Sequence, residues 1–284
     1  ATRSFYDFFI DTTGNVNLSL DSSAASYTYK WNTQLTTGNW QHLTLTQDSD
    51  GTLACYKGLQ QTTDPNTNNQ IVWLPLNEGT GTTAFDRSGR TTTYNGTLVN
   101  ATYTGIDTKF GTSTVNFNGT SAYVTTTYLP DLTLPFTWTM WVYTTTTGVE
   151  QPLVAIGDND GTWEAYELVF EILASNYLSV GQNGRFDHIS SGQAPAIPIN
   201  TWTHVGLVYN GSGTYTVYIN GVLGYTRNTG STNFSAPGGS TLTLGRYGSG
   251  VSPSSGFAYF SGNMSDFRAY NTNLSAAQIN YIYN

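Results

Sequence analysis

The chain has 284 residues, enough for one large β domain or two domains of ordinary size. Only 10% of the residues are charged and the formal net charge is −8, so we expect no binding to nucleic acid, whose phosphate backbone attracts basic surfaces. The one cysteine, Cys55, excludes a disulfide framework or a zinc cluster of cysteines within the chain. No apolar run approaches the roughly 20 residues of a membrane-spanning helix, so we expect no membrane insertion.

Near its start the chain carries a segment that it repeats later. The stretch "NWQHLTLTQDSDGTLACYKG" (39–58) is matched by "TWTHVGLVYNGSGTYTVYING" (201–221). One offset relates Trp40 to Trp202 and Tyr56 to Tyr218. Further upstream, "FYDFFID" (5–11) resembles "AYELVFEI" (165–172). Residues 1–62 are therefore predicted to be a copy of roughly residues 165–228.

The repeated segment has the pattern of a β-hairpin. In the later copy, apolar residues alternate with other residues on both sides of the turn "NGSG" (210–213). These apolar positions are Val205, Leu207, Tyr209, Tyr215, Val217 and Ile219. The earlier copy repeats the pattern around "DSDG" (48–51), and its Cys55 falls on Val217, an apolar strand position. Period-two alternation around a turn predicts two antiparallel strands.

After a polar linker (63–70) that contains a proline, the chain continues with short β-like segments up to its last residues. Strand candidates recur every 8–15 residues, which is typical of a sandwich or jelly roll. These segments are 71–89, 95–100, 113–126, 136–144, 151–158, 166–172, 177–181, 204–209, 214–219, 241–246 and 262–271. One helix is predicted at 275–284, where Ser275 and Gln278 form a capping box. Ile279 and Ile282 would share one face of this helix.

Three motifs in order resemble the laminin G-like, concanavalin A-like lectin/glucanase jelly-roll family. They are "IVWLPLNEGTGTTAFDRSG" with "FNGTSAYVTT", then "TWTHVGLVYNGSGTYTVYINGVL", then "FSGNMSDFRAYNTNLSAAQINYIYN". The resemblance covers about residues 70–284. It implies an all-β fold, a two-sheet antiparallel jelly-roll sandwich with a short C-terminal helix. Residues 71–284 would form a complete sandwich, preceded by a partial copy in residues 1–62, the second half of such a repeat.

A half-sandwich of about 60 residues would leave one apolar face bare, which is unfavourable for an isolated unit. Four arrangements would resolve this problem. The chain is a fragment of a longer tandem array, or another chain supplies the missing half. Alternatively, the half-domain stacks its sheet on the complete domain, or it has been remodelled into an independent small domain. We expect a longer or assembled protein, with self-assembly through the incomplete half-domain as one form of it.

The best catalytic candidates are Glu167 and Glu171, which would point to the same face of one strand. Related glycoside hydrolases carry Glu-x-Asp-x-Glu on such a strand, with one Glu as nucleophile and one as acid/base. Here Val169 occupies the middle position, and the first copy has Asp7 and Asp11 with Phe9 between them. The departure favours a solvent-facing acidic strand, and we expect no enzyme.

The resemblance also implies a structural calcium site near the opening loop and the last strand. Asp86, Asn95 and Asp266 occupy the matching places, and calcium prefers such oxygen ligands. The alternative is a turn residue at Asp86 that accepts hydrogen bonds from its own backbone. Asp266 would then pair with Arg87 or Arg268.

A sugar-binding surface needs an aromatic face and a few planar polar groups. Trp163, Tyr177, Asn183 and Arg185 lie on or beside loops near the acidic strand and are the predicted ligand-binding residues. The alternative is that Trp163 and Tyr177 pack in the core.

Taken together, the sequence favours a non-enzymatic adhesion or assembly module of an extracellular, cell-surface or virion protein. Its expected partners are glycans or other surface proteins. The alternatives are a purely structural subunit of a fibre, filament or capsid decoration, and a glycoside hydrolase that acts on polysaccharide.

Overall fold

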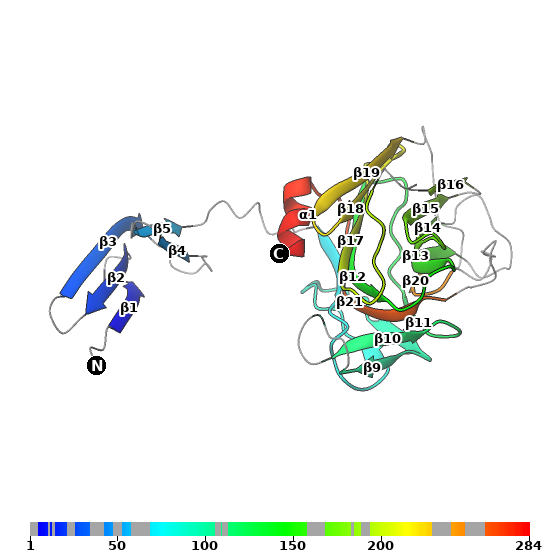
Figure 1. The fold of residues 1–284 in the computed structure, drawn as a ribbon, viewed down its shortest axis with the longest axis horizontal. Helices are drawn as coiled ribbons and strands as arrows, with labels where there is room; N and C mark the ends of the chain where they lie inside the picture. The colour runs from blue at the N-terminus through cyan, green and yellow to red at the C-terminus, as the bar shows by residue number, and fades with distance from the viewer. Residues whose placement is uncertain are drawn as a thin grey trace. The chain divides into compact units, whose positions relative to one another are not determined.

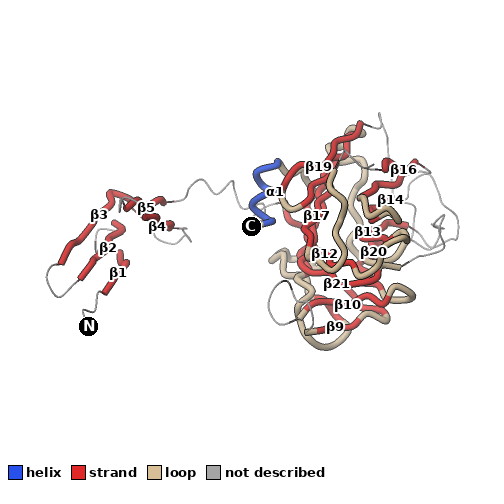
Figure 2. The backbone as a smooth tube through the Cα atoms, viewed as in Figure 1, coloured by secondary structure: helices blue, strands red, loops and turns tan. Residues whose placement is uncertain are grey.

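The structure is a computed structural model that divides into two compact units, residues 1–61 and 62–284. It describes residues 5–10, 12, 15–21, 26–34, 43–47, 53–57, 69–105, 109, 113–157, 168–182, 185–188, 194–228, 240–247 and 259–284. Strands predominate in both units, as Figure 2 shows.

The larger unit is a sandwich of two antiparallel sheets, sheet I and sheet II (Figure 1). Sheet I contains, in spatial order, β19 (Val222–Asn228), β18 (Thr214–Ile219), β17 (Thr203–Tyr209), β12 (Phe136–Thr144), β21 (Ser261–Tyr270), β10 (Thr114–Asn118) and β9 (Thr102–Thr104), with β6 (Gln70–Leu74) also on β21. Sheet II contains β16 (Arg185–His188), β15 (Leu178–Gln182), β14 (Leu168–Ile172), β13 (Gln151–Gly157), β20 (Thr241–Leu244), β11 (Tyr123–Thr126), β8 (Gly96–Val99) and β7 (Thr83–Ala84). The predicted all-β jelly-roll sandwich is confirmed for this unit.

The hydrophobic core lies between the two sheets and follows from the alternation of side chains along each strand. In β12, Trp138, Met140 and Val142 enter the core, and sheet II contributes residues such as Ile156 and Phe170 from the other side. Each large apolar side chain that is removed from water stabilises the fold by about 1.5–3 kcal/mol. The alternate residues of each strand therefore lie on the two outer faces, where function has to be sought.

The C-terminal helix α1 (Ala276–Tyr283) covers part of the outer face of sheet I, beside β17 to β19 (Figure 1). Ser275 and Gln278 form the predicted capping box, and Ile279 and Ile282 are buried, so this prediction is confirmed. The two isoleucines pack in one cluster with Val208, Tyr218, Tyr270 and Leu274. In the part of the chain that the structure describes, no helix has the length and apolar character to cross a membrane.

The smaller unit holds two groups of antiparallel strands. β1 (Phe5–Ile10), β2 (Asn15–Asp21) and β3 (Ser26–Gln34) pair in that order, and β4 (Leu43–Gln47) pairs with β5 (Leu53–Lys57). Adding 162 to both members of the pair Leu43↔Lys57 gives Val205↔Ile219 of the β17–β18 hairpin. The same number converts Phe8↔Leu18 into Phe170↔Val180 of the β14–β15 hairpin.

This register corrects one detail of the sequence alignment. The similarity of "FYDFFID" to "AYELVFEI" had placed Asp7 and Asp11 on Glu167 and Glu171, an offset of 160. With the offset of 162 that the strand pairing supports, Phe9 falls on Glu171. The acidic pair of the complete sandwich therefore has no acidic counterpart in β1.

Candidate functional site

Four side chains form a row across the outer face of sheet I, which we call the amide–aromatic row: Trp202, Tyr143, Asn263 and Asn116. Tyr143 and Asn116 each lie directly opposite Asn263 in the strand register, and Trp202 precedes β17 beside Tyr143. The two ring centroids are 5.6 Å apart, with the planes tilted by 52°. Asn116 Nδ2 donates a 2.8 Å hydrogen bond to Asn263 Oδ1. With about 4.8 Å between neighbouring strands, the row extends over roughly 14 Å.

The amide–aromatic row is partly open to solvent. Trp202, Tyr143 and Asn116 are half-buried, whereas Asn263 is buried. Helix α1 packs on a different part of the face, around Val208 and its neighbours. Aromatic rings offer apolar faces to sugar C–H groups, and amides offer both donors and acceptors to hydroxyl groups. The chemistry of the row therefore suits an extended polyhydroxylated ligand.

The next row along the strands is closed. Trp141 and His204 are directly opposite in the register of β12 and β17, and both are buried. Tyr283 of α1 stacks on Trp141 with centroids 5.4 Å apart, and the Lys109 ammonium lies 3.7 Å from the centre of the same ring. Burial lowers the pKa of His204 to about 3, and the positive charges of Arg268 and Lys109 act in the same direction. His204 is therefore a neutral packing residue beneath α1, and it is unsuited to proton transfer near neutral pH.

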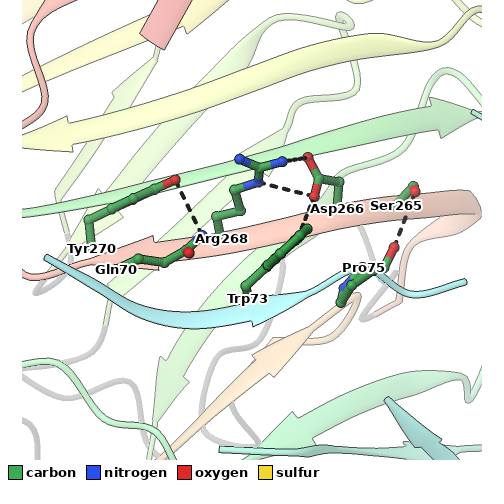
Figure 3. A network of polar contacts seen from close by, with 7 residues as sticks. All are labelled: Gln70, Trp73, Pro75, Ser265, Asp266, Arg268 and Tyr270. Carbon is green, nitrogen blue, oxygen red and sulfur yellow. Dashed lines mark hydrogen bonds and ion pairs between the residues drawn. The ribbon is translucent and has the colours of Figure 1, made fainter. Parts of the chain in front are cut away.

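A polar network joins β6 to β21 at a bulge in sheet I (Figure 3). Trp73 Nε1 donates a 2.7 Å hydrogen bond to Asp266 Oδ1, and Arg268 Nη2 lies 3.0 Å from Asp266 Oδ2. Asp266 has a φ of 55°, and its N–H donates to the Pro75 carbonyl at 3.0 Å. Burial raises the pKa of Asp266, and the charge of Arg268 opposes this shift. Of the two arginine partners expected for Asp266, the structure selects Arg268.

The three residues predicted as calcium ligands do not form one cluster of free oxygens. Asp86 Oδ1 accepts hydrogen bonds from the N–H groups of Trp73 (3.0 Å) and Ser88 (2.9 Å), and Oδ2 accepts from Tyr94 (2.9 Å). Asn95 Oδ1 accepts from the Asp86 N–H at 2.9 Å. Asp266 is bound to Trp73 and Arg268, as described above. Because hydrogen-bond donors occupy the positions that a cation needs, these residues do not fit a calcium site as arranged.

Glu171 lies on the outer face of sheet II, but Tyr247 packs over this face and the carboxyl is buried. The expectation of a solvent-facing acidic strand is therefore wrong for Glu171. Its side chain is 1% exposed, and the Tyr247 hydroxyl donates a hydrogen bond to Oε2. Tyr247 itself packs on Ala155 and Val169. Burial raises the pKa of Glu171 to about 7, Glu150 adds to the shift, and the hydroxyls of Tyr247 and Ser179 oppose it. In this arrangement Glu171 holds Tyr247 against sheet II. Its predicted partner Glu167 lies outside the described residues.

The predicted glycan residues are not gathered in the described structure. Tyr177 is half-buried in the turn between β14 and β15, where it packs against the core, in line with the alternative given for it. Arg185 is at the other end of β15, opposite Gln182. Five residues of strand, about 17 Å, separate the two ends. Trp163 and Asn183 lie outside the described residues.

The fold is a two-sheet β-sandwich of the concanavalin A-like type. The family model of the concanavalin A-like lectin/glucanases superfamily matches residues 118–280, more than half of the chain. The chain belongs to this superfamily, as the sequence motifs predicted. No curated protein sequence matches the chain.

Solved structures share the fold at low sequence identity. Domain 4 of AbnA, an extracellular GH43 arabinanase from Geobacillus stearothermophilus, was solved in complex with arabinotriose; it is 17% identical with a TM-score of 0.55, over 76% of this chain and 98% of that one. The binding domain of botulinum neurotoxin serotype D/C is also 17% identical, with a TM-score of 0.57 over 78% of this chain. The binding domain of botulinum neurotoxin DC, solved with rat synaptotagmin II, is 17% identical with a TM-score of 0.54 over 76% of this chain. The chain spans about half the length of these toxin domains, 52% and 51%.

Proposed function

We propose that the complete sandwich is a non-catalytic recognition module of an extracellular or virion-surface protein, and that it binds a glycan along the amide–aromatic row. One observation carries the proposal. Two half-buried aromatic rings, Trp202 and Tyr143, continue into two amides, Asn263 and Asn116, on the outer face of sheet I and outside the cluster in which α1 packs. The row extends over roughly 14 Å, which suits a ligand of about three sugar units.

Each contact in such a complex is weak. A sugar ring that stacks on Trp202 gains about 1 kcal/mol beyond the area that it buries. A hydrogen bond from Asn116 adds about 1 kcal/mol net. With so few contacts we expect dissociation constants between about 10 μM and 1 mM, and useful affinity would come from several modules on one surface.

The structural relatives support the proposal through their printed partners. Domain 4 of AbnA, which is matched over 98% of its length, was solved with arabinotriose, and this supports a glycan ligand. The botulinum neurotoxin DC binding domain was solved with rat synaptotagmin II, but this chain matches only 51% of it. Because these structures are only 17% identical to the chain, they support the fold, and the roles of their residues are not transferred to it. The amides and aromatics of the row favour a glycan over a protein partner, because a protein interface of standard size also needs a desolvated apolar centre.

The hydrolase alternative has one observation in its favour, the raised pKa of Glu171, which would suit a general acid. A general acid must reach its substrate, and Glu171 is 1% exposed and hydrogen-bonded to Tyr247. The geometry therefore favours binding without catalysis. A purely structural subunit remains the alternative to be separated by experiment.

A glycan array followed by calorimetry tests the proposal. We expect the chain to bind a subset of glycans. Trp202→Ala, which loses both the stacking and the buried area, should weaken binding at least tenfold, and Asn116→Ala should weaken it about fivefold. Tyr281→Ala is the matched control, since Tyr281 is 40% exposed on α1 and lies outside the row. A blank array would favour the structural role. Release of reducing sugar from polysaccharide that is lost in Glu171→Gln would favour the hydrolase.

A further inference from the structure

Two hairpins of the smaller unit repeat the geometry of hairpins that do not stand alone in the complete sandwich. The β1–β2 and β4–β5 hairpins carry the registers of β14–β15 and β17–β18 at one offset, as shown above. Their turns also agree in length. Five residues lie between Ile10 and Val16, as between Ile172 and Leu178.

In the complete sandwich, β14 and β17 each have a second neighbour. β13 pairs with β14 in sheet II, and β12 pairs with β17 in sheet I. β12 and β13 are consecutive strands joined by residues 145–150, so one continuous segment lines both positions. We call this segment, residues 136–157, the β12–β13 arch. The arch contributes a set of apolar side chains to the core between the sheets: Phe136, Trp138, Met140, Val142, Leu153, Val154 and Ile156.

The smaller unit presents the matching edges. The pairing described for β1 is with β2, and that for β4 is with β5. In sequence, the apolar residues Phe8 and Ile10 of β1 take the places of Phe170 and Ile172, which lie in the core. Leu45 of β4 takes the place of the core residue Leu207. A strand edge next to an apolar face is a template for another strand.

We propose that β1 and β4 together form a docking surface for a strand–turn–strand segment of the kind formed by the β12–β13 arch, donated by a further half-sandwich outside residues 1–284. The donor adds one strand to each edge by antiparallel pairing, and its alternate apolar side chains cover the face of the unit. A second copy of this chain is a poor donor. Its own arch is held on both sides, by β17 and β21 for β12 and by β14 and β20 for β13.

The test uses the full chain and a synthetic peptide of residues 136–157 with lysines added at both ends for solubility. Amide hydrogen exchange is measured strand by strand at increasing peptide concentration. We expect at least tenfold slower exchange in both β1 and β4, with no change in β14 and β17, whose second neighbours are already in place. The control is the same peptide with N-methyl groups along both strands, which keeps the side chains and removes the ladder donors.

The outcomes separate the possible occupants. Slowing in both strands with the plain peptide alone supports the proposal. Slowing in neither strand, or in one only, contradicts docking of an arch. Slow exchange of β1 and β4 in the monomeric chain without peptide would mean that the edges are already filled. Protection that instead rises with chain concentration, together with dimers in sedimentation, would make a second copy the occupant and overturn the choice of donor.

Discussion

Replacing Asp266 with alanine should destabilise the complete sandwich by about 4 kcal/mol. The change leaves the Arg268 guanidinium, whose side chain is 18% exposed, without its carboxylate, and it removes the acceptor of the Trp73 indole N–H. Breaking a buried ion pair costs about 3–5 kcal/mol, and the remaining exposure of Arg268 places this case in the lower part of that range. Alanine at a φ of 55° adds roughly 1 kcal/mol of backbone strain.

Asp266→Asn is the matched control. Asparagine tolerates the left-handed backbone and keeps one oxygen for Trp73, so it removes mainly the charge that faces Arg268. We expect it to cost about 2 kcal/mol, half the effect of alanine. The comparison therefore separates the lost charge from the lost acceptor and the strain.

Scanning calorimetry of the full chain measures both variants. For a unit of this size, 1 kcal/mol lowers Tm by about 2–4 °C, so we expect a fall of about 12 °C for alanine and about 6 °C for asparagine. Our account of the network would be refuted by an alanine variant within 1 kcal/mol of the parent protein. It would equally fail if asparagine were as harmful as alanine, because the charge alone would then carry the whole effect.

Three further predictions concern α1, the buried acid and calcium. Ile279→Ala should cost about 2–4 kcal/mol in calorimetry, because Ile279 is fully buried against sheet I, whereas Tyr281→Ala, at a position that is 40% exposed, should lower Tm much less. Glu171 has a folded-state pKa of about 7 against 4.5 when unfolded, so the folded chain holds this proton more tightly. Stability should therefore decrease by about 3 kcal/mol as pH rises from about 4.5 to about 7, and Glu171→Gln should remove this decrease in urea titrations. A decrease that survives in Glu171→Gln would assign it to another group. Calcium at millimolar concentration should not shift Tm relative to EDTA, because N–H donors occupy the Asp86 carboxylate; a rise of several degrees would reveal a calcium site.

The fold could be predicted because its determinants are local. Alternation in 204–219 predicts two strands, and the structure has β17 and β18 there. Ser275 and Gln278 predict the start of α1 from a spacing of three residues. Asp266 could be paired in advance with an arginine, since Arg268 lies two residues away on the same strand face.

The candidate site could not be predicted because it depends on long-range pairing. Asn116, Tyr143, Trp202 and Asn263 come from four separate segments, and they meet only because β10, β12, β17 and β21 are neighbours in sheet I. The alternation of side chains along β12 places Tyr143 on the face opposite to that of the apolar core residues. It does not say which strands lie beside β12. The predicted ligand-binding residues were grouped because they are close in sequence. This was misleading because an extended strand such as β15 separates residues at its two ends, which then lie at opposite edges of the sheet.

Nuclear magnetic resonance of the side-chain N–H groups tests the central claim most directly. The tightest ligand from the glycan array is titrated into labelled chain, and the signals of the Trp202 indole and of the Asn116 and Asn263 amides are followed. Our account predicts that these three signals shift together with one dissociation constant, whereas signals of β14 to β16 stay in place. Shifts confined to sheet II around Glu171, with the three row signals unmoved, would contradict it.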